Sequence, residues 1–333
     1  MTSDQPTILV TGGAGYIGSH TVLALKNANY DVVILDNLEH GHRDLLEKVL
    51  HDVELVVGDI SDRSLVDNLF ASRKIDAVIH FAAYIAVGES VSDPAKYYRN
   101  NVSGTLTLLE AMMAANVNKF VFSSTCAIYG EPKIVPIPEE HPRYPISPYA
   151  TSKLMVEEIL ADFDRAYNFK SVRFRFFNAA GAHPEGILGE DHHPETHLIP
   201  LVLQTALGRR ESVSILGTDY PTPDGTGLRD YIHVNDIAAA HILGLEYLLG
   251  GGDSQEFNLG NGCGFSVREV IESAKQVTGR DVKAIECERR PGDPPILVGS
   301  SNKVKTILGW KPQYPDLEEI IAHAWQWHQY RHG

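Results

Sequence analysis

The feature that most constrains the fold of this chain is a glycine-rich turn between an apolar segment and a helical one. Residues 7–18 read TILVTGGAGYIG, a continuous apolar run followed by overlapping G-x-G-x-x-G and T-G-x-x-G-x-x-G patterns that include Gly12, Gly15 and Gly18. Glycine permits positive φ and close approach of the backbone to a phosphate, and the helix that follows offers free N–H groups and a positive dipole end. A strand, a turn and a helix in this order predict a dinucleotide-binding unit.

Further apolar runs alternate with helical patterns through the first half of the chain. We expect strands at 31–37, 54–60, 77–83, 119–125 and 172–178, and helices at 62–73, 93–116, 149–167 and 229–249. Continuous apolar runs are typical of parallel strands buried on both faces. The pattern therefore predicts an α/β fold with a doubly wound parallel sheet of Rossmann type.

Acidic residues follow the second and third predicted strands. Asp36, in DVVILDN, is placed to accept hydrogen bonds from an adenosine ribose and to repel a 2′-phosphate, which favours NAD over NADP. Asp59, in GDI, could meet the adenine amino group. A simple turn formed by the DN pair is the alternative interpretation of Asp36.

The amino-acid composition changes in the second half of the sequence. Residues 179–228 are rich in Gly, Pro and His, as expected of loops that line a pocket. We expect an NAD-binding Rossmann domain at 1–177, to which the chain returns at about 229–250, and a smaller mixed α/β lobe at 178–333.

Composition excludes several classes of partner. The chain has 29 basic and 43 acidic side chains and a net charge of −14, whereas nucleic acids and anionic membranes require a basic surface. The start of the sequence has no basic segment of a signal peptide, and no apolar run approaches the ~20 residues of a membrane span. We expect a cytoplasmic protein that binds neither.

Cysteine and histidine usage predicts no metal site. The three cysteines are odd in number and form no C-x-x-C pair, which favours a reducing compartment. His192, His193 and His197, in EDHHPETHLIP, lack a familiar ligand spacing, so we interpret them as polar loop residues.

A hydroxyl, a phenol and an amine fall near the carboxyl edge of the predicted sheet. Thr125 ends the strand FVFSST, and Tyr149 and Lys153 are one helical turn apart in SPYATSK. A phenol with a pKa near ~10 must be lowered by about 3 units to act near neutrality, and a close ammonium and a positive nicotinamide could supply this. Tyr149 is then the base that removes a hydroxyl proton while hydride leaves the same carbon.

Taken together, the motifs resemble a known family. VTGGAGYIGSH, HFAA, YYRNNVSGT, FSSTCAIYG, SPYATSKLMVE, FRFFNAAGAHP, DGTGLRDYIHV, FNLGNG and RRPGDP extend over nearly the whole chain. The sequence is similar to the extended short-chain dehydrogenase/reductases and, among them, closely to the UDP-glucose 4-epimerase family. The resemblance implies tightly bound NAD and inversion at C4 of a UDP-hexose through a 4-keto sugar.

The resemblance also implies roles for individual residues. Expected cofactor contacts are Gly12, Gly15, Tyr16, Ile17, Gly18, Asp36, Asn37, Asp59, Ile60, Phe81, Ala82, Ala83, Asn100, Tyr149, Lys153 and Phe177. Expected contacts of the UDP-sugar are Thr125, Asn178, Leu198, Arg229, Arg290, Asp293 and Leu297. Arginines suit a diphosphate and a carboxylate suits ribose hydroxyls. The alternatives are a surface pair for Arg290 and a salt bridge with Asp230 for Arg229.

The sugar pocket is expected to be wide. Leu297 lies four positions after Asp293, where the resemblance places a residue bordering the hexose, and leucine leaves space that a tyrosine would fill. An N-acetylated UDP-sugar is then a possible substrate. A core leucine is the alternative, and a one-residue slip would put Ile296 or Val298 at this place.

Two positions depart from the family pattern. Ile85 stands where well-known members carry a lysine that touches the cofactor, and Phe176 replaces a common tyrosine. Neither position takes part in proton or hydride transfer.

Other functions are compatible with the same fold. A 4,6-dehydratase needs an acidic pair after the threonine, where this chain has Cys126 and Ala127. A UDP-xylose/UDP-arabinose 4-epimerase and a dehydrogenase that releases NADH remain enzyme alternatives. A non-catalytic NAD-binding sensor would typically lack the tyrosine and lysine.

The helices at 93–116 and 149–167 have broad apolar faces. Leu154, Val156, Ile159, Leu160 and Phe163 exceed what one sheet face can cover. The resemblance implies that a homodimer buries the surplus through a four-helix bundle.

Overall fold

The computed structural model describes residues 5–290 and 293–332, which form two compact units. Unit 1 comprises the described residues up to Ile128 together with Arg143–Arg175 and Ala238–Phe257. Unit 2 comprises Tyr129–Pro142, Phe176–Ile237 and the described residues from Asn258 onward.

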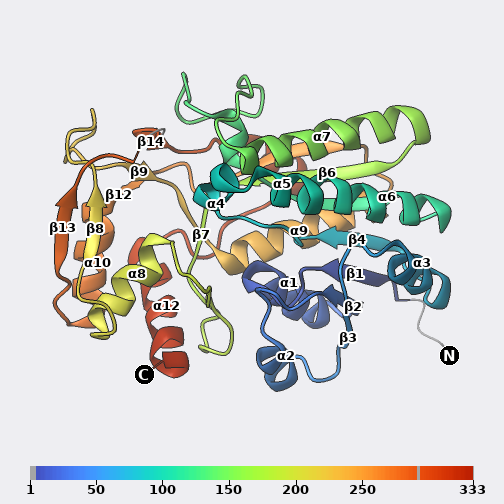
Figure 1. The fold of residues 1–333 in the computed structure, drawn as a ribbon, viewed down its shortest axis with the longest axis horizontal. Coiled ribbons are helices and arrows are strands. Elements are labelled where there is room, and N and C mark those ends of the chain that lie inside the picture. The colour runs from blue at the N-terminus through green and yellow to red at the C-terminus, as the bar shows by residue number, and fades with distance from the viewer. Residues whose placement is uncertain (1–4, 291–292, 333) are drawn as a thin grey trace. The chain divides into compact units, whose positions relative to one another are not determined.

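A seven-stranded sheet forms the centre of unit 1 (Figure 1), which confirms the predicted doubly wound fold. The strand order is β11-β6-β5-β4-β1-β2-β3, and β1 pairs in parallel with both β2 and β4. The strands are β1 (Thr7–Thr11), β2 (Asp31–Asp36), β3 (Glu54–Val57), β4 (Ala77–His80), β5 (Lys119–Thr125), β6 (Lys170–Phe176) and β11 (Gln255–Leu259).

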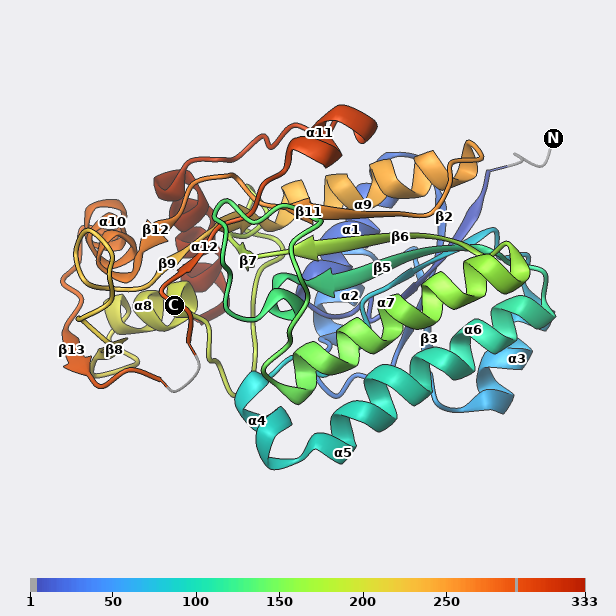
Figure 2. The ribbon, with the colours of Figure 1, turned by 90° about the horizontal axis from the view of Figure 1, so that it is seen from above.

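Helices cover both faces of this sheet (Figures 1 and 2). Alternate side chains of the strands, such as Val78 and Phe120, pack with Leu108, Met112 and Val156 of the helices on one face. Helices α1 and α9 lie on the other face. The helical segments are α1 (Tyr16–Asn27), α2 (Arg43–Val49), α3 (Arg63–Ser72), α4 (Val87–Ser92), α5 (Pro94–Tyr97), a π-helix (Tyr98–Gly104), α6 (Thr105–Ala114), a 3₁₀ turn (Cys126–Tyr129), α7 (Pro148–Tyr167) and α9 (Val234–Leu249).

The limits of α7 follow from its sequence. Ser147 accepts a hydrogen bond from the Ala150 N–H at 3.2 Å, and Pro148 occupies the first turn, where no N–H is needed. Asn168 ends the helix with a left-handed φ of 55°. These two caps place Tyr149 and Lys153 in the first two turns.

Unit 2 is built from short elements. Its core packs α8 (Leu198–Ala206), α10 (Val267–Thr278) and α12 (Leu317–His332) around residues such as Val202, Ile271 and Ile320. The other elements are β7 (Asn178–Ala180), β8 (Val213–Leu216), β9 (Leu228–Arg229), β10 (Tyr231–His233), β12 (Phe265–Ser266), β13 (Ala284–Cys287), β14 (Ile296–Leu297) and α11 (Asn302–Leu308).

Two predicted helices are wrong in part. Residues 229–233 are not helical, because Tyr231–His233 pairs in parallel with Asn178–Ala180, and the helix begins only at Val234. The predicted helix at 93–116 is divided into α5, the π-helix and α6. None of the helices in the described part of the chain is both long enough and apolar enough to span a bilayer.

Candidate active site

The glycine turn of unit 1 has the geometry that only glycine allows. Gly12 has a φ of 74°, and a Cβ there would lie 2.6 Å from the Ala82 nitrogen. A Cβ on Gly18 would lie 2.1 Å from the Gly12 carbonyl oxygen. Helix α1 then begins at Tyr16 with no side-chain cap and no acidic residue in its first turn. Its first N–H groups are therefore suited to a pyrophosphate.

Asp36 ends β2 beside this turn. Its carboxylate accepts hydrogen bonds from the backbone N–H of Ala14 at 2.9 Å and of Leu38 at 2.8 Å. Burial raises the pKa of Asp36, and these two hydrogen bonds oppose the shift. Each oxygen retains acceptor capacity for a ribose hydroxyl.

Asp59 lies close to Asn37, whose amide donates to its carboxylate at 3.1 Å. A cavity of about 390 Å³ opens here, lined by Asp59, Ser61, Tyr84, Asp93, Lys96, Arg99 and Asn100. Two residues predicted to contact the cofactor, Asp59 and Asn100, therefore line the same cavity.

The remaining predicted cofactor residues fall in both units. Tyr16 and Ile17 open α1, Ile60 is buried after β3, and Phe81, Ala82 and Ala83 follow β4. Phe177 belongs to unit 2 and is buried, with its ring against Gly299. Ile85 is 44% exposed.

The Thr125 side chain acts on the Tyr149 phenol, whose pKa it lowers, and Lys153 lies one turn along α7. Lys153 Nζ donates to the Ser123 carbonyl at 2.8 Å and lies 4.9 Å from the centre of the Phe122 ring. The Thr125 hydroxyl oxygen accepts from the Ala127 N–H at 3.2 Å, which leaves its proton for the phenol oxygen. Unit 1 thus brings the three predicted catalytic side chains together.

The pKa values of this pair are set mainly by burial. Burial raises the pKa of Tyr149 to about 12, although the hydrogen bond from Thr125 opposes the rise. Burial lowers the pKa of Lys153 to about 7. The lowering expected for the phenol is therefore not a property of the chain alone, and it requires positive charge in the cleft.

Two polar residues that the sequence did not single out support the pair. Asn101 is buried, accepts from the Tyr84 N–H at 2.9 Å and donates to Ser152 Oγ at 3.1 Å, so it ties the loop after β4 to α7. Glu157 is fully buried and pairs with Arg175 at 2.6 Å. It also accepts from Ser124 at 2.5 Å, next to Thr125. In the sequence, the one sign that these two residues support the site is their position beside recognised motifs.

In unit 2, Arg229 and Asp293 pair with each other at 2.6 Å. The alternative pairing of Arg229 with Asp230 is not formed, because Asp230 accepts hydrogen bonds from the backbone of Asn261, Gly262 and Gly299 instead. Asn178 begins β7, Leu198 begins α8, and Arg290 is exposed.

Leu297 is placed by its strand pairing. β14 pairs in parallel with β9, so that Leu297 is the partner of Arg229 and Ile296 the partner of Leu228. Paired residues project to the same face of a sheet, and neighbours along a strand project to opposite faces. Leu297 therefore shares a face with Arg229, whereas Val298 is buried.

The chain belongs to the NAD dependent epimerase/dehydratase family, whose model matches residues 8–260. A UDP-glucose 4-epimerase of Halalkalibacterium halodurans is 55% identical, covering 98% of this chain and 97% of the relative. The crystal structure of a Brucella ovis UDP-glucose 4-epimerase with NAD superposes with a TM-score of 0.93 at 46% identity, covering 96% and 97% of the two chains. A UDP-Glc/GlcNAc 4-epimerase of Campylobacter jejuni gives a TM-score of 0.86 at 43% identity, covering 98% and 99%.

Proposed function

We propose that this enzyme interconverts UDP-glucose and UDP-galactose by inversion at C4, through a 4-keto sugar and with tightly bound NAD. The observation that carries the proposal is the position of Lys153 one helical turn from the buried Tyr149, with Thr125 acting on the same phenol, in the unit that contains the dinucleotide turn. Full-length likeness to UDP-glucose 4-epimerases supports the same reaction.

Each catalytic side chain has a physical role in this proposal. Tyr149 accepts the proton of the C4 hydroxyl, and Thr125 donates a hydrogen bond that stabilises the phenolate. Lys153, whose Nζ donates to the Ser123 carbonyl, lies one helical turn from the phenol and adds positive charge there when it is protonated. When bound, NAD supplies the centre that takes the C4 hydrogen as hydride and returns it to the other face of the sugar.

The assay for this function uses the purified enzyme with UDP-glucose and no added NAD, with the products resolved by chromatography. We expect a mixture of UDP-glucose and UDP-galactose. Conversion that occurs only with stoichiometric NAD⁺ would identify a dehydrogenase, and no conversion of UDP-glucose, with turnover of UDP-xylose, would redirect the substrate assignment.

Asp36 supports NAD as the cofactor rather than NADP. A carboxylate held by two backbone N–H groups accepts from ribose hydroxyls and repels a 2′-phosphate. Denatured protein should release NAD or NADH. Recovery of mainly NADP would contradict this role.

In unit 2 we assign the nucleotide-sugar contacts to Asn178, Leu198, Arg229, Arg290 and Asp293. The ion pair between Arg229 and Asp293 supports this assignment, because it holds a guanidinium and a carboxylate at one place, where a diphosphate and a ribose could each find a partner.

Leu297 is assigned to the border of the sugar pocket, and its register opposite Arg229 supports Leu297 over Ile296 and Val298. Leucine leaves room for an N-acetyl group at C2, so we expect turnover of UDP-N-acetylglucosamine as well. Leu297→Tyr should suppress that activity selectively, since a steric clash outweighs the ~1–3 kcal/mol of one apolar contact. Undetectable wild-type activity on the N-acetylated sugar excludes the idea.

We further propose a homodimer. Val156 and Leu160 are buried within unit 1, but Val87 and Val91 of α4 and Met155 of α7 remain between 43% and 64% exposed. Exposed apolar side chains on neighbouring helices favour association. Light scattering at micromolar concentration should give twice the chain mass of 36.7 kDa, and a monomer would reject this state.

A further inference from the structure

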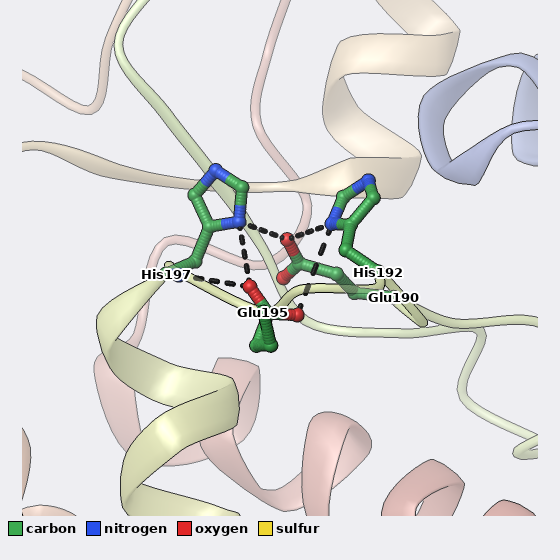
Figure 3. A group of neighbouring side chains, drawn as sticks. All are labelled: Glu190, His192, Glu195 and His197. Atoms are coloured by element: carbon green, nitrogen blue, oxygen red, sulfur yellow. Dashed lines mark hydrogen bonds and ion pairs between the residues drawn. The ribbon is translucent and has the colours of Figure 1, made fainter. Parts of the chain in front are cut away.

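Four ligand-type side chains converge in the loop that leads into α8 (Figure 3). Glu190, His192, Glu195 and His197 each direct one nitrogen or oxygen toward a common point, and these atoms all lie within 4.8 Å of one another. His193, between them in the sequence, is exposed and contacts the backbone of His192. The structure therefore selects two of the three histidines and adds two glutamates.

The distances within this cluster suit a coordination shell. Glu190 Oε1 lies 3.1 Å from His192 Nδ1 and 2.8 Å from His197 Nδ1. Glu195 Oε2 lies 3.8 Å from His192 Nδ1, beyond hydrogen-bonding distance. Ligand atoms about 2.0–2.2 Å from a zinc ion are about 3.3–3.6 Å apart at the corners of a tetrahedron. The observed separations bracket that spacing.

Hydrogen bonding alone fits these atoms poorly. His197 Nδ1 faces two carboxylate oxygens, Glu190 Oε1 at 2.8 Å and Glu195 Oε1 at 2.9 Å, yet it can carry only one proton. The side chains of Glu190 and Glu195 are only 6% and 5% exposed. Two carboxylates so close together and so little hydrated call for a compensating positive charge.

The loop is held in this arrangement by α12. Trp327 Nε1 donates to the Glu190 carbonyl at 2.9 Å, and Arg331 pairs with Asp191 at 2.8 Å. Glu195 Oε1 also accepts from the backbone N–H groups of Thr196 and His197, at 2.7 and 2.8 Å. The ligand atoms are therefore fixed by contacts that a bound ion need not supply.

A further imidazole on α12 lies in the electrostatic field of the cluster. His328 is 2% exposed, interacts electrostatically with Glu190 and Glu195, and its Nδ1 has no hydrogen-bond partner within the described part of the chain. A buried nitrogen without a partner costs free energy. A water molecule on a nearby ion is one group that would satisfy it.

We propose that Glu190, His192, Glu195 and His197 bind one divalent transition-metal ion of the zinc class. Two imidazoles with two carboxylates suit zinc better than magnesium or calcium, which prefer sets of oxygen ligands alone. The ion binds both Nδ1 lone pairs and both carboxylates, and it joins the loop to the start of α8. In this proposal the E-x-H-x-x-E-x-H pattern supplies metal ligands and is more than a set of polar loop residues. This site does not depend on the proposed epimerase function.

Metal binding tests the site directly. The full chain with its native cofactor is treated with a chelator, dialysed against buffered Zn²⁺ and analysed for metal by mass spectrometry. We expect one ion per chain and a rise of a few degrees in the unfolding temperature. Co²⁺ in place of Zn²⁺ should give the visible absorption of a four-coordinate nitrogen and oxygen site. Zinc content well below one ion per chain overturns the proposal.

Variants assign the ligands. Glu190→Gln and His192→Ala should weaken Zn²⁺ binding at least about tenfold, since even the loss of an outer-shell partner has effects of this size. His193→Ala is the matched control and should bind Zn²⁺ like the wild type. Equal loss in the control, or no loss in the two ligand variants, contradicts the assignment. If a variant fails to fold, the Co²⁺ spectrum of the wild-type protein decides.

Discussion

In unit 1 the catalytic candidates stand at the ends of long regular elements, whereas in unit 2 three of the candidate residues, Asn178, Arg229 and Leu297, stand on strands of two or three residues. Thr125 ends a seven-residue strand and Tyr149 begins a 20-residue helix. Arg229 and Leu297 lie on two-residue strands, and buried Asp230 holds the backbone around them through three N–H groups. Unit 1 positions its site by secondary structure, and unit 2 relies more on buried side-chain hydrogen bonds.

The largest expected effect concerns the chemistry of unit 1. Tyr149→Phe keeps the ring and removes the proton acceptor, so turnover of UDP-glucose should fall by about 10²–10⁴-fold, the usual range for general acid–base catalysis. The released cofactor should stay at wild-type levels, because the elements that bind it are unchanged. Tyr144→Phe is the matched control, since Tyr144 is 68% exposed just before α7. Turnover within tenfold of wild type removes Tyr149 from its role.

The next prediction compares a buried carboxylate from each unit. Asp230→Ala leaves three backbone N–H groups without their acceptor and should reduce the free energy of unfolding by about 2–4 kcal/mol. Asp36→Ala leaves two such groups without their acceptor, at the end of a strand that hydrogen bonds within the sheet also stabilise. The free energy of unfolding should therefore fall by only about 1–2 kcal/mol. Urea unfolding after removal of NAD measures both. Equal losses would show that unit 2 does not depend more on buried carboxylates than unit 1.

Lys153 gives unit 1 a pH dependence. Its pKa is lowered by burial from 10.5 to about 7, so between these values the unfolded chain binds more protons than the folded one. The stability of NAD-free protein should therefore rise with pH above 7 through this residue, by up to about 1 kcal/mol per pH unit. Lys153→Met removes the contribution, so unfolding at pH 7, 8 and 9 should show the free energy of unfolding of the wild type rising relative to that of the variant. A difference that stays constant with pH contradicts the lowered pKa of this buried amine.

The same contrast explains what could be predicted from the sequence. In unit 1 the strands, the glycine turn and the Tyr149–Lys153 spacing follow from local periodicity, because each element is long enough to display its pattern. The prediction of helix at 229–233 is wrong, because a three-residue strand such as Tyr231–His233 has no periodicity of its own and is defined only by its pairing with β7.

Contacts between side chains could not be predicted from the sequence for a related reason. The pairing of Arg229 with Asp293 joins residues 64 positions apart, and the convergence of Glu190 with His197 depends on how an irregular loop bends. Spacing along the chain does not determine distances of this kind. A residue such as Asn101 lies within a recognised motif, yet its contact with Ser152 depends on the packing of α7.

The smallest expected effect concerns Thr125 at the end of β5 and tests whether its hydroxyl or its methyl group matters for turnover. Thr125 acts through its hydroxyl, which hydrogen-bonds Tyr149 and lowers the pKa of the phenol against the effect of burial. Thr125→Ser keeps that group and loses only a methyl, so kcat should stay within about threefold of wild type, whereas Thr125→Ala should lose about tenfold, the value of one hydrogen bond to a charged group. The pH profile of the alanine variant should also shift upward, because its phenol ionises less readily. If serine is as damaging as alanine, the methyl group, by fixing the rotamer at the end of β5, matters more than the hydroxyl.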